Sequence, residues 1–600
     1  MENGFKDFRN IHEMLKETAD RLGEAPAYRW FTAPGERETI SWDDFHAQVR
    51  QAARALAALG VKKDDGVTIL GYTCYRWVLC DIATAILGAR TVGIFQTLLP
   101  PEVAYITEHG DAVVAFAENE DQLAKMREIR NRLPGVRKVV LFSGSPAESD
   151  GDWVIGFDEF LALADTIPEA ELDERIDAVA PEDIAAIVYT SGTTGIPKGA
   201  MLTHDNLTFT AQSVAGSVVW EPEDEVLLFL PLAHVFARTT VYTALFAGCP
   251  MTFCRGIEFI GEDIKVVRPH WFPSVPRIYE KVQAKVMGMA EAKGGVALKL
   301  FEWAFSVGFE RSDLVMAGEP IPTGLKFRHT LADRLVLSKV RAALGGRVRW
   351  CISGAAPLNP DVARWFHAAG VIVVEGLGMT ENTSFSNLNR YDDYRFGRVG
   401  PPGPGIEQRI AENGEIQFRG RNVMKGYYKM PEETKETFTD DGWLRTGDLG
   451  EIDEGNSLRI TGRIKDIIVT SGGKNISPAR VEEVLTRSRF INQVMVVGDR
   501  RNYLSALVTL EPEATAEFAR REGLSFSDIG DLIDRPEIVQ LIETEVAERN
   551  RELASFETVK KVRIVPEFTI ESGILTPTMK IKKNVATERY AEKIDGMYAG

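Results

Sequence analysis

The chain has few cysteines, no cysteine pair motif and no long apolar run, and each shortage excludes a class of protein. Five cysteines occur among 600 residues and none belongs to a C-x-x-C pair, so the sequence predicts neither a disulfide framework nor a zinc site. No uninterrupted apolar run approaches the roughly 20 residues of a spanning helix, and the N-terminus lacks the pattern of a signal peptide. These shortages predict a chain of the reducing cytoplasm, with peripheral membrane contact left open.

Positive charge is also scarce. Lys and Arg total 70 against 87 Asp and Glu, a net charge of −17, which argues against a general affinity for nucleic acid. Any phosphate-binding site must therefore be local. The length suits about two to four domains or subdomains, and no metal cluster, heptad array or internal repeat is evident.

The segment YTSGTTGIPKGA, at 189–200, has the composition of a phosphate-binding loop. Its glycines let backbone N–H groups approach an anion closely, its hydroxyls add donors, and Lys198 supplies a positive charge. It follows the apolar, strand-like run 184–188, and α/β proteins place phosphates where a strand enters a glycine loop. A flexible Ser/Gly/Thr turn is the alternative. The common NTPase P-loop is excluded, because it requires a glycine at Pro197 and a hydroxyl at Gly199.

The elements around this loop indicate an α/β protein. Helical periodicity alternates with short β-rich runs between residues 41 and 118. Thr203 is a candidate helix N-cap, and we expect the helix that it caps to begin on the same side as the loop. The C-terminal part, about 463 to 600, has strands and helices of its own, as expected for an independent α+β unit.

Further motifs follow in order, and each alone is weak. They are LPLAHVFART (230–239), SGAAPL (353–358), EGLGMTE (375–381), GWLRTGDLG (442–450), GRIKDIIVTSGGK (462–474) and ILTPTMKIKKN (574–584). A lone histidine such as His234 is more often a hydrogen-bonded core residue than a catalyst. G-x-G-x-T-E is usually a loop, and Asp448, which we place in a turn between strands, would ordinarily be a local cap.

Taken together, these motifs closely resemble the adenylate-forming superfamily, which includes acyl-CoA synthetases, luciferases and the adenylation domains of peptide synthetases. The largely helical block 275–349 resembles the long-chain fatty acyl-CoA synthetase branch, in which this segment shapes the tunnel for the acyl chain. The resemblance covers nearly the whole chain. It implies an α/β N-terminal domain at 1–462 that binds ATP and fatty acid, and a smaller, mobile α+β catalytic domain at 463–600 that turns about a hinge at Lys465.

The resemblance also implies roles for individual residues. Catalytic roles fall to Lys580, Thr380, Glu381 and His234, with His234 positioning groups rather than exchanging protons, and Mg²⁺ ligation falls to Thr194 and Glu381. Contacts to ATP or coenzyme A fall to Thr190, Ser191, Gly192, Thr193, Thr194, Gly195, Lys198, Gly354, Ala355, Ala356, Glu375, Asp448, Arg463, Lys465, Gly472 and Gly473. Two positions depart from the pattern, since many relatives have a tyrosine at Leu377 and a glycine at Met579.

The implied activity is ATP-dependent ligation of a long-chain fatty acid to coenzyme A through an acyl-adenylate, with release of AMP and pyrophosphate. A ligase that passes the acyl group to a carrier protein would use the same first half-reaction and stays open. A luciferase-like oxygenase would need chemistry that no motif here reveals. A non-catalytic nucleotide-binding or membrane scaffold is disfavoured by the complete set of charged residues. The sequence also leaves a homodimer open.

Overall fold

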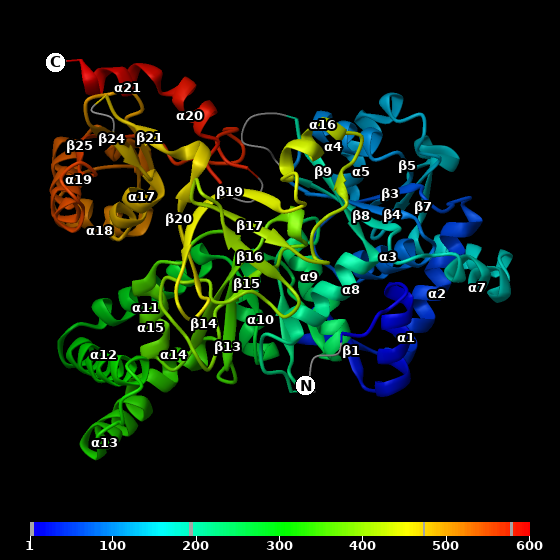
Figure 1. The fold of residues 1–600 in the computed structure, drawn as a ribbon. Coiled ribbons are helices and arrows are strands. Elements are labelled where there is room, and N and C mark those ends of the chain that lie inside the picture. The colour runs from blue at the N-terminus through cyan, green and yellow to red at the C-terminus, as the bar shows by residue number, and fades with distance from the viewer. Residues whose placement is uncertain (1–4, 191–195, 222, 472–473, 577–579, 600) are drawn as a thin grey trace.

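The computed structural model describes residues 5–190, 196–221, 223–471, 474–576 and 580–599. Figure 1 shows a large body, blue to yellow, and a small C-terminal body in orange and red. Their hydrophobic cores are separate: the buried clusters of the first extend no further than Leu458, and those of the second begin at Ile468. We call residues 5–463 the large body and residues 464–599 the small body. This architecture confirms the predicted α/β fold with a smaller C-terminal unit.

The largest sheet of the large body has eight strands in the order β18-β9-β8-β4-β3-β5-β6-β7. Strands β3 to β8 are parallel, whereas β9 and β18 add antiparallel to one edge. The strands are β3 (Gly66–Leu70), β4 (Arg90–Ile94), β5 (Ala112–Ala117), β6 (Lys138–Leu141), β7 (Val154–Gly156), β8 (Ile184–Thr190), β9 (Lys198–Thr203) and β18 (Gly426–Tyr427).

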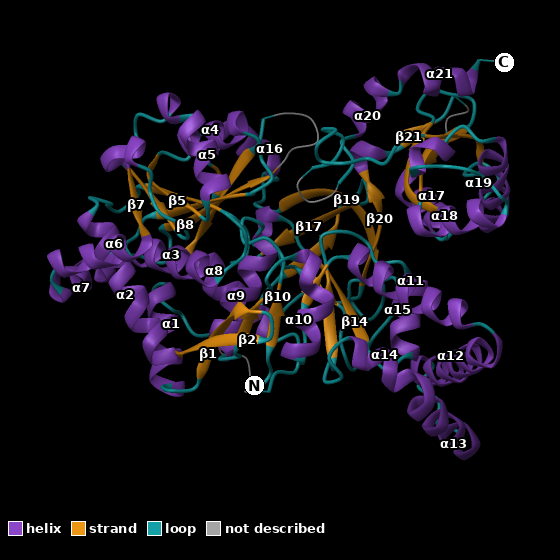
Figure 2. Cartoon of the chain, turned by 180° about the vertical axis from the view of Figure 1, so that it is seen from behind, coloured by secondary structure: helices purple, strands orange, loops and turns teal. Residues whose placement is uncertain are grey.

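The alternation of side chains along a strand gives this sheet two apolar faces. In β5, Val114 and Phe116 join the cluster that contains α2 and α3, whereas Ala115 and Ala117 join the cluster that contains α4 and α5. Both views show these helix pairs on opposite sides of the sheet (Figures 1 and 2). The helices of this region are α1 (Ile11–Leu22), α2 (Trp42–Ala58), α3 (Tyr75–Ile86), α4 (Pro100–His109), α5 (Glu120–Glu128), α6 (Phe157–Ala162) and α7 (Glu169–Asp177).

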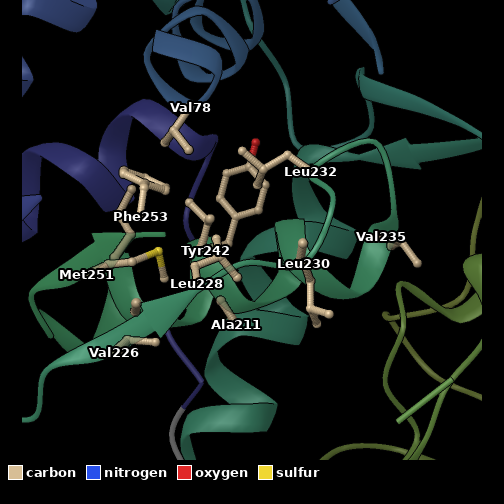
Figure 3. Close-up of a cluster of buried hydrophobic side chains, with 14 of the residues drawn as sticks. Val78, Ala211, Val226, Leu228, Leu230, Leu232, Val235, Tyr242, Met251 and Phe253 are labelled. Carbon is tan, nitrogen blue, oxygen red and sulfur yellow. The ribbon is translucent and has the colours of Figure 1, made fainter. Parts of the chain in front are cut away.

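A second packing unit lies between the large sheet and the C-terminal half of the large body. Its sheet has the order β10-β11-β1-β2, and Figure 3 shows Leu228, Tyr242, Met251 and Phe253 gathered in one buried cluster. The elements are β1 (Pro26–Ala33), β2 (Glu36–Ser41), α8 (His204–Ala215), β10 (Val226–Leu228), α9 (Val235–Ala247), β11 (Met251–Phe253) and α10 (Ile260–Val267).

Two further sheets complete the large body, in the orders β12-β13-β14-β15 and β16-β17-β19-β20. Their strands are β12 (Pro273–Ser274), β13 (Trp350–Ser353), β14 (Ile372–Leu377), β15 (Asn387–Leu388), β16 (Glu407–Ile410), β17 (Glu415–Arg419), β19 (Leu444–Ile452) and β20 (Leu458–Arg463). Their helices are α15 (Pro360–Ala368) and α16 (Pro431–Thr437).

A helical arm, residues 276–343, projects from the large body and confirms the predicted helical block (Figures 1 and 2). It consists of α11 (Pro276–Lys293), α12 (Gly295–Met316), α13 (Thr323–Ala332) and α14 (Ser338–Ala343). Within the described residues, no helix is both long and apolar enough to cross a bilayer.

The small body begins after β20 with a short 3-10 turn, Ile464–Asp466, and has the sheet orders β21-β22 and β23-β24-β25. Its elements are β21 (Ile468–Val469), β22 (Asn475–Ile476), α17 (Pro478–Thr486), β23 (Ile491–Val497), β24 (Leu504–Leu510), α18 (Pro512–Arg521), α19 (Pro536–Arg549), β25 (Val559–Ile564), α20 (Lys583–Arg589) and α21 (Ala591–Tyr598).

Candidate active site at the junction of the two bodies

The glycine-rich segment connects the antiparallel strands β8 and β9. Tyr189 pairs with Gly199 and Thr190 pairs with Lys198, so the predicted strand-to-loop arrangement is present. The predicted contacts at Ser191, Gly192, Thr193, Thr194 and Gly195 lie outside the described residues. Gly199 has a packing reason to be glycine, because a Cβ there would lie 2.7 Å from Cγ2 of Ile187.

The expected direction of the helix after this loop is wrong. Thr203 does cap α8, accepting a hydrogen bond of 3.1 Å from the backbone N–H of Asn206. However, β9 runs antiparallel to β8, and Thr203 pairs with Ile184 at the opposite end of the hairpin from the loop. The start of α8 therefore points away from the phosphate loop.

A tyrosine that the sequence analysis did not identify links two predicted site residues. The ammonium of Lys198 lies 5.1 Å from the ring centroid of Tyr427, and the Tyr427 hydroxyl donates a 2.5 Å hydrogen bond to Glu381 Oε1. Burial and the Glu381 carboxylate raise the pKa of Tyr427, which keeps this hydroxyl a donor. The pairing of β18 with β9 positions the ring. The sequence around Tyr427, GYYK, contains no motif that would identify this tyrosine as a site residue.

Two neighbouring parallel strands, β13 and β14, bring the SGAAPL and EGLGMTE motifs together. Ser353 pairs with Glu375, so both motifs leave the same edge of the sheet. Gly354 faces the ring of Phe236, 3.2 Å from where a Cβ would stand, and Ala355 has a left-handed φ of 69°. The predicted contacts at Gly354, Ala355 and Ala356 thus lie directly beside the start of α9.

The EGLGMTE motif contributes an apolar side chain, a hydroxyl and two carboxyl groups. Leu377 ends β14, whereas Thr380 and Glu381 form the start of a 3-10 turn, with Glu381 buried. The Glu375 carboxyl is buried and accepts a 3.2 Å hydrogen bond from the N–H of Leu358. Burial raises the pKa of Glu375 to about 8, with a smaller contribution from the negative charge of Glu483 in the small body. Glu375 is therefore protonated at neutral pH.

Asp448 and Arg463 are paired, and Asp448 lies in a strand rather than in the predicted turn. Asp448 in β19 is the register partner of Arg463 in β20, and its Oδ1 accepts a 2.6 Å hydrogen bond from Arg463 Nε. Gly447, with φ of 70°, gives the TGD sequence its turn character inside the strand. The two predicted ribose contacts therefore form one unit at the end of the large body.

His234 is a neutral imidazole that accepts a backbone hydrogen bond in this structure. Its Nδ1 accepts a 3.1 Å hydrogen bond from the N–H of Phe236 at the start of α9, so the ring proton belongs on Nε2. Burial, together with the positive charge of Lys580, lowers the pKa of His234 to about 4. With Nδ1 occupied and the proton on Nε2, neither ring nitrogen is free to accept a proton. The ring can therefore position neighbouring groups without exchanging protons.

Lys580 extends from the small body into this group. Desolvation and the positive charge of Arg463 lower its pKa, and the carboxylates of Asp448 and Glu381 oppose that effect. By surface area the Lys580 side chain is exposed to solvent. Lys580 is thus close enough to residues of the large body for their charges to act on it. Met579 lies outside the described residues.

The connection between the bodies contains Lys465, which is exposed in the Ile464–Asp466 turn. The predicted coenzyme A contacts at Gly472 and Gly473 lie outside the described residues. Apart from these and the central phosphate loop, the structure brings the predicted site residues to one junction: the end of β8, the ends of β13 and β14, the start of α9, and the β19–β20 pair.

A glycine-rich loop after a strand, together with charged residues from two separate bodies, is typical of nucleotide-dependent enzymes. Comparison with known proteins identifies the family. Residues 15–428 match the AMP-binding enzyme family, and residues 465–600 match the AMP-binding enzyme C-terminal domain. The chain belongs to the AMP-binding enzyme family, the adenylate-forming superfamily that the motifs resembled.

Curated relatives extend over most of the chain. The long-chain-fatty-acid–CoA ligase FadD15 of Mycobacterium tuberculosis is 36% identical over 559 residues, covering 92% of this chain and 91% of the relative. The human long-chain-fatty-acid–CoA ligase ACSBG1 is 31% identical, with 98% and 85% covered. These similarities place the chain in the long-chain acyl-CoA synthetase branch, as predicted.

Solved structures share the fold. The adenylation and carrier didomain of a carboxylic acid reductase from Segniliparus rugosus, in complex with AMP, has a TM-score of 0.77 at 22% identity, covering 99% of this chain and 82% of that one. The anthranilate CoA ligase AuaEII, in complex with anthranoyl-AMP, has a TM-score of 0.71 at 20% identity, with 97% of each chain covered.

The buried Glu375 carboxyl predicts a pH dependence of stability. Because its folded-state pKa of about 8 exceeds the ordinary 4.5, the folded chain binds more protons than the unfolded chain between these values. Stability from this group is therefore present at low pH and is lost as pH rises. We expect Glu375→Gln to raise the thermal midpoint relative to the parent increasingly from pH 5 to pH 9. The exposed Glu412→Gln is the control, and a constant difference across this range would contradict the assignment.

Proposed function

We propose that this enzyme ligates a long-chain fatty acid to coenzyme A through an acyl-adenylate. The observation that carries the proposal is the position of Lys580, which lies close enough to Asp448, Glu381 and His234 of the large body for their charges to interact. An ammonium at the meeting point of nucleotide and carboxylate contacts suits a reaction in which negative charge gathers on an α-phosphate. The relatives' names support the ligase activity and the fatty acid.

In the first half-reaction, a carboxylate oxygen of the fatty acid bonds to the α-phosphorus of ATP, and pyrophosphate leaves with the electrons of the broken P–O bond. Lys198, at the end of the phosphate loop, holds phosphate oxygens, and the Asp448–Arg463 pair holds the ribose. Lys580 contacts both the entering carboxylate and the α-phosphate. The contribution of these residues is positioning and charge stabilisation.

Mg²⁺ fits this site through Glu381. Carboxylate oxygen is a ligand that Mg²⁺ prefers, and the ion commonly takes one or two carboxylates together with substrate phosphates. No group of three or more His, Cys, Asp or Glu suited to a metal occurs among the described residues, so phosphates and water would complete the shell. When bound, Mg²⁺ would neutralise part of the triphosphate charge.

In the second half-reaction, the sulfur of coenzyme A bonds to the acyl carbon, the bond from that carbon to the phosphate oxygen breaks, and AMP leaves. The thiol proton passes to solvent, because His234 carries its proton on Nε2 and has Nδ1 occupied. Before this step the small body turns about Lys465 and withdraws Lys580. The separate hydrophobic cores on either side of the Ile464–Asp466 connection support such a turn.

Replacement of Lys580 should separate the two half-reactions. Lys580→Ala should lower pyrophosphate release from ATP and fatty acid by at least about 10²–10³-fold, the magnitude of one lost preorganised donor. Thioester formation from supplied acyl-adenylate and coenzyme A should persist. Lys582→Ala, two positions away, is the matched control. Equal losses in both reactions would contradict a role confined to adenylation.

The acyl chain length should determine specificity. Each buried methylene is worth roughly 0.8 kcal/mol, so kcat/KM should rise up to about fourfold per added methylene until the acyl site is filled. The measurement is a series of saturated acids with ATP, in which AMP and thioester are followed together. The long-chain proposal fails if acetate or an aromatic acid is the better substrate. AMP formation with transfer only to a carrier protein would favour the alternative acceptor.

A further inference from the structure

Arg277 connects the helical arm to the small body. It lies in the first turn of α11, and its Nη2 lies 3.1 Å from Glu511 Oε2 and also contacts Oδ1 of Asn492. Both acceptors belong to the small body, at the end of β24 and in β23. The Asn492 amide is oriented for this contact, because its Nδ2 donates a 3.1 Å hydrogen bond to Glu567.

Two weaker ion pairs cross the same boundary. Arg489 Nη1 lies 3.4 Å from Glu291 Oε2 at the end of α11, and Arg487 Nε lies 3.7 Å from Asp361 Oδ2 in α15. In both pairs the arginine belongs to the small body. The Arg277 contact differs from these two pairs in two ways. Its arginine belongs to the large body, and its guanidinium contacts two acceptors of the small body, Glu511 and Asn492.

We infer that Arg277 is a positioning residue that holds the small body in the orientation in which Lys580 reaches the active site. In this structure the Arg277 contacts and the approach of Lys580 to Asp448 and Glu381 occur together. A turn about the Ile464–Asp466 connection would move Glu511 and Asn492 with the small body and leave Arg277 behind. Arg277 would therefore stabilise the adenylating orientation and contribute nothing to the thioester-forming one. This inference rests on the proposed two-step function.

The expected effect is moderate, because the pair is partly exposed to solvent. The side chains of Arg277 and Glu511 are 37% and 31% exposed, and such pairs shift an equilibrium by about fivefold at most. Reversal of the charge should have a larger effect than simple removal. A glutamate at 277 would face Glu511, with Glu280 of the same helix, now 3.4 Å from Arg277, close by.

The test compares both half-reactions in the full-length enzyme. In Arg277→Glu we expect pyrophosphate release from ATP and fatty acid, without coenzyme A, to fall by about fivefold or more. Thioester formation from supplied acyl-adenylate and coenzyme A should be unchanged or faster. Adding Glu511→Arg to Arg277→Glu should restore adenylation, which a merely structural defect would not allow. Glu511→Gln tests the same contact from the small body, should Arg277→Glu not fold.

Arg9→Glu is the matched control, because Arg9 forms a partly exposed ion pair with Asp177 at 2.7 Å inside the large body, outside the helical arm and the site. It should change neither half-reaction. Unchanged adenylation in Arg277→Glu, equal losses in both half-reactions, or no rescue by the charge exchange would each overturn the inference. If the parent enzyme itself fails to convert acyl-adenylate to thioester, the proposed function fails first, and the positioning role fails with it.

Discussion

The arrangement depends on the Lys580 ammonium being held where the two bodies meet. Partial desolvation of this cation and the positive charge of Arg463 both lower its pKa. The carboxylates of Asp448 and Glu381 act in the opposite direction and favour the charged form of Lys580. A turn of the small body would remove Lys580 from both carboxylates at once. The charge environment of Lys580 therefore depends on the orientation of the small body.

The large body supplies a rigid frame for this cation. Glu381 is held by the Tyr427 hydroxyl, which the pairing of β18 with β9 positions above Lys198. His234 is fixed at the start of α9 by the N–H of Phe236, whose ring in turn faces Gly354. Strand pairing and the start of α9 therefore fix the positions of several predicted site residues relative to their neighbours. Rigid placement of this kind lowers the reorganisation that a charge-building reaction requires.

The sequence correctly predicted those site segments that directly follow a strand. The apolar run before the glycine loop is β8, and the motifs at 353–358 and 375–381 leave neighbouring parallel strands, as their strand-like leaders indicated. Asp448 and Arg463 were selected from a family pattern, and their direct pairing follows from the antiparallel register of β19 and β20. The predicted turn at Asp448 was wrong, because a TGD sequence is typical of a turn even where a strand continues through it.

Features that depend on long-range pairing could not be predicted. Tyr427 contacts Glu381 because β18 joins the edge of the large sheet, and a strand of only two residues gives no sequence pattern that predicts this pairing. The direction of α8 required knowing that β9 is antiparallel to β8. Likewise, nothing near Arg277 in the sequence indicates Glu511 as its partner. Such contacts join segments that are far apart in the sequence, and a pattern within a short window cannot predict them.

The central claim is that one orientation of the small body adenylates and another forms the thioester. The most direct measurement links the bodies covalently as they stand here, with Arg277→Cys and Asn492→Cys joined by a short bis-maleimide. Four of the five native cysteines are buried and Cys74 is partly so, and the parent enzyme treated alike is the control. The linked enzyme should release pyrophosphate from ATP and fatty acid but fail to convert supplied acyl-adenylate and coenzyme A to thioester. Undiminished thioester formation in the linked enzyme would contradict the account.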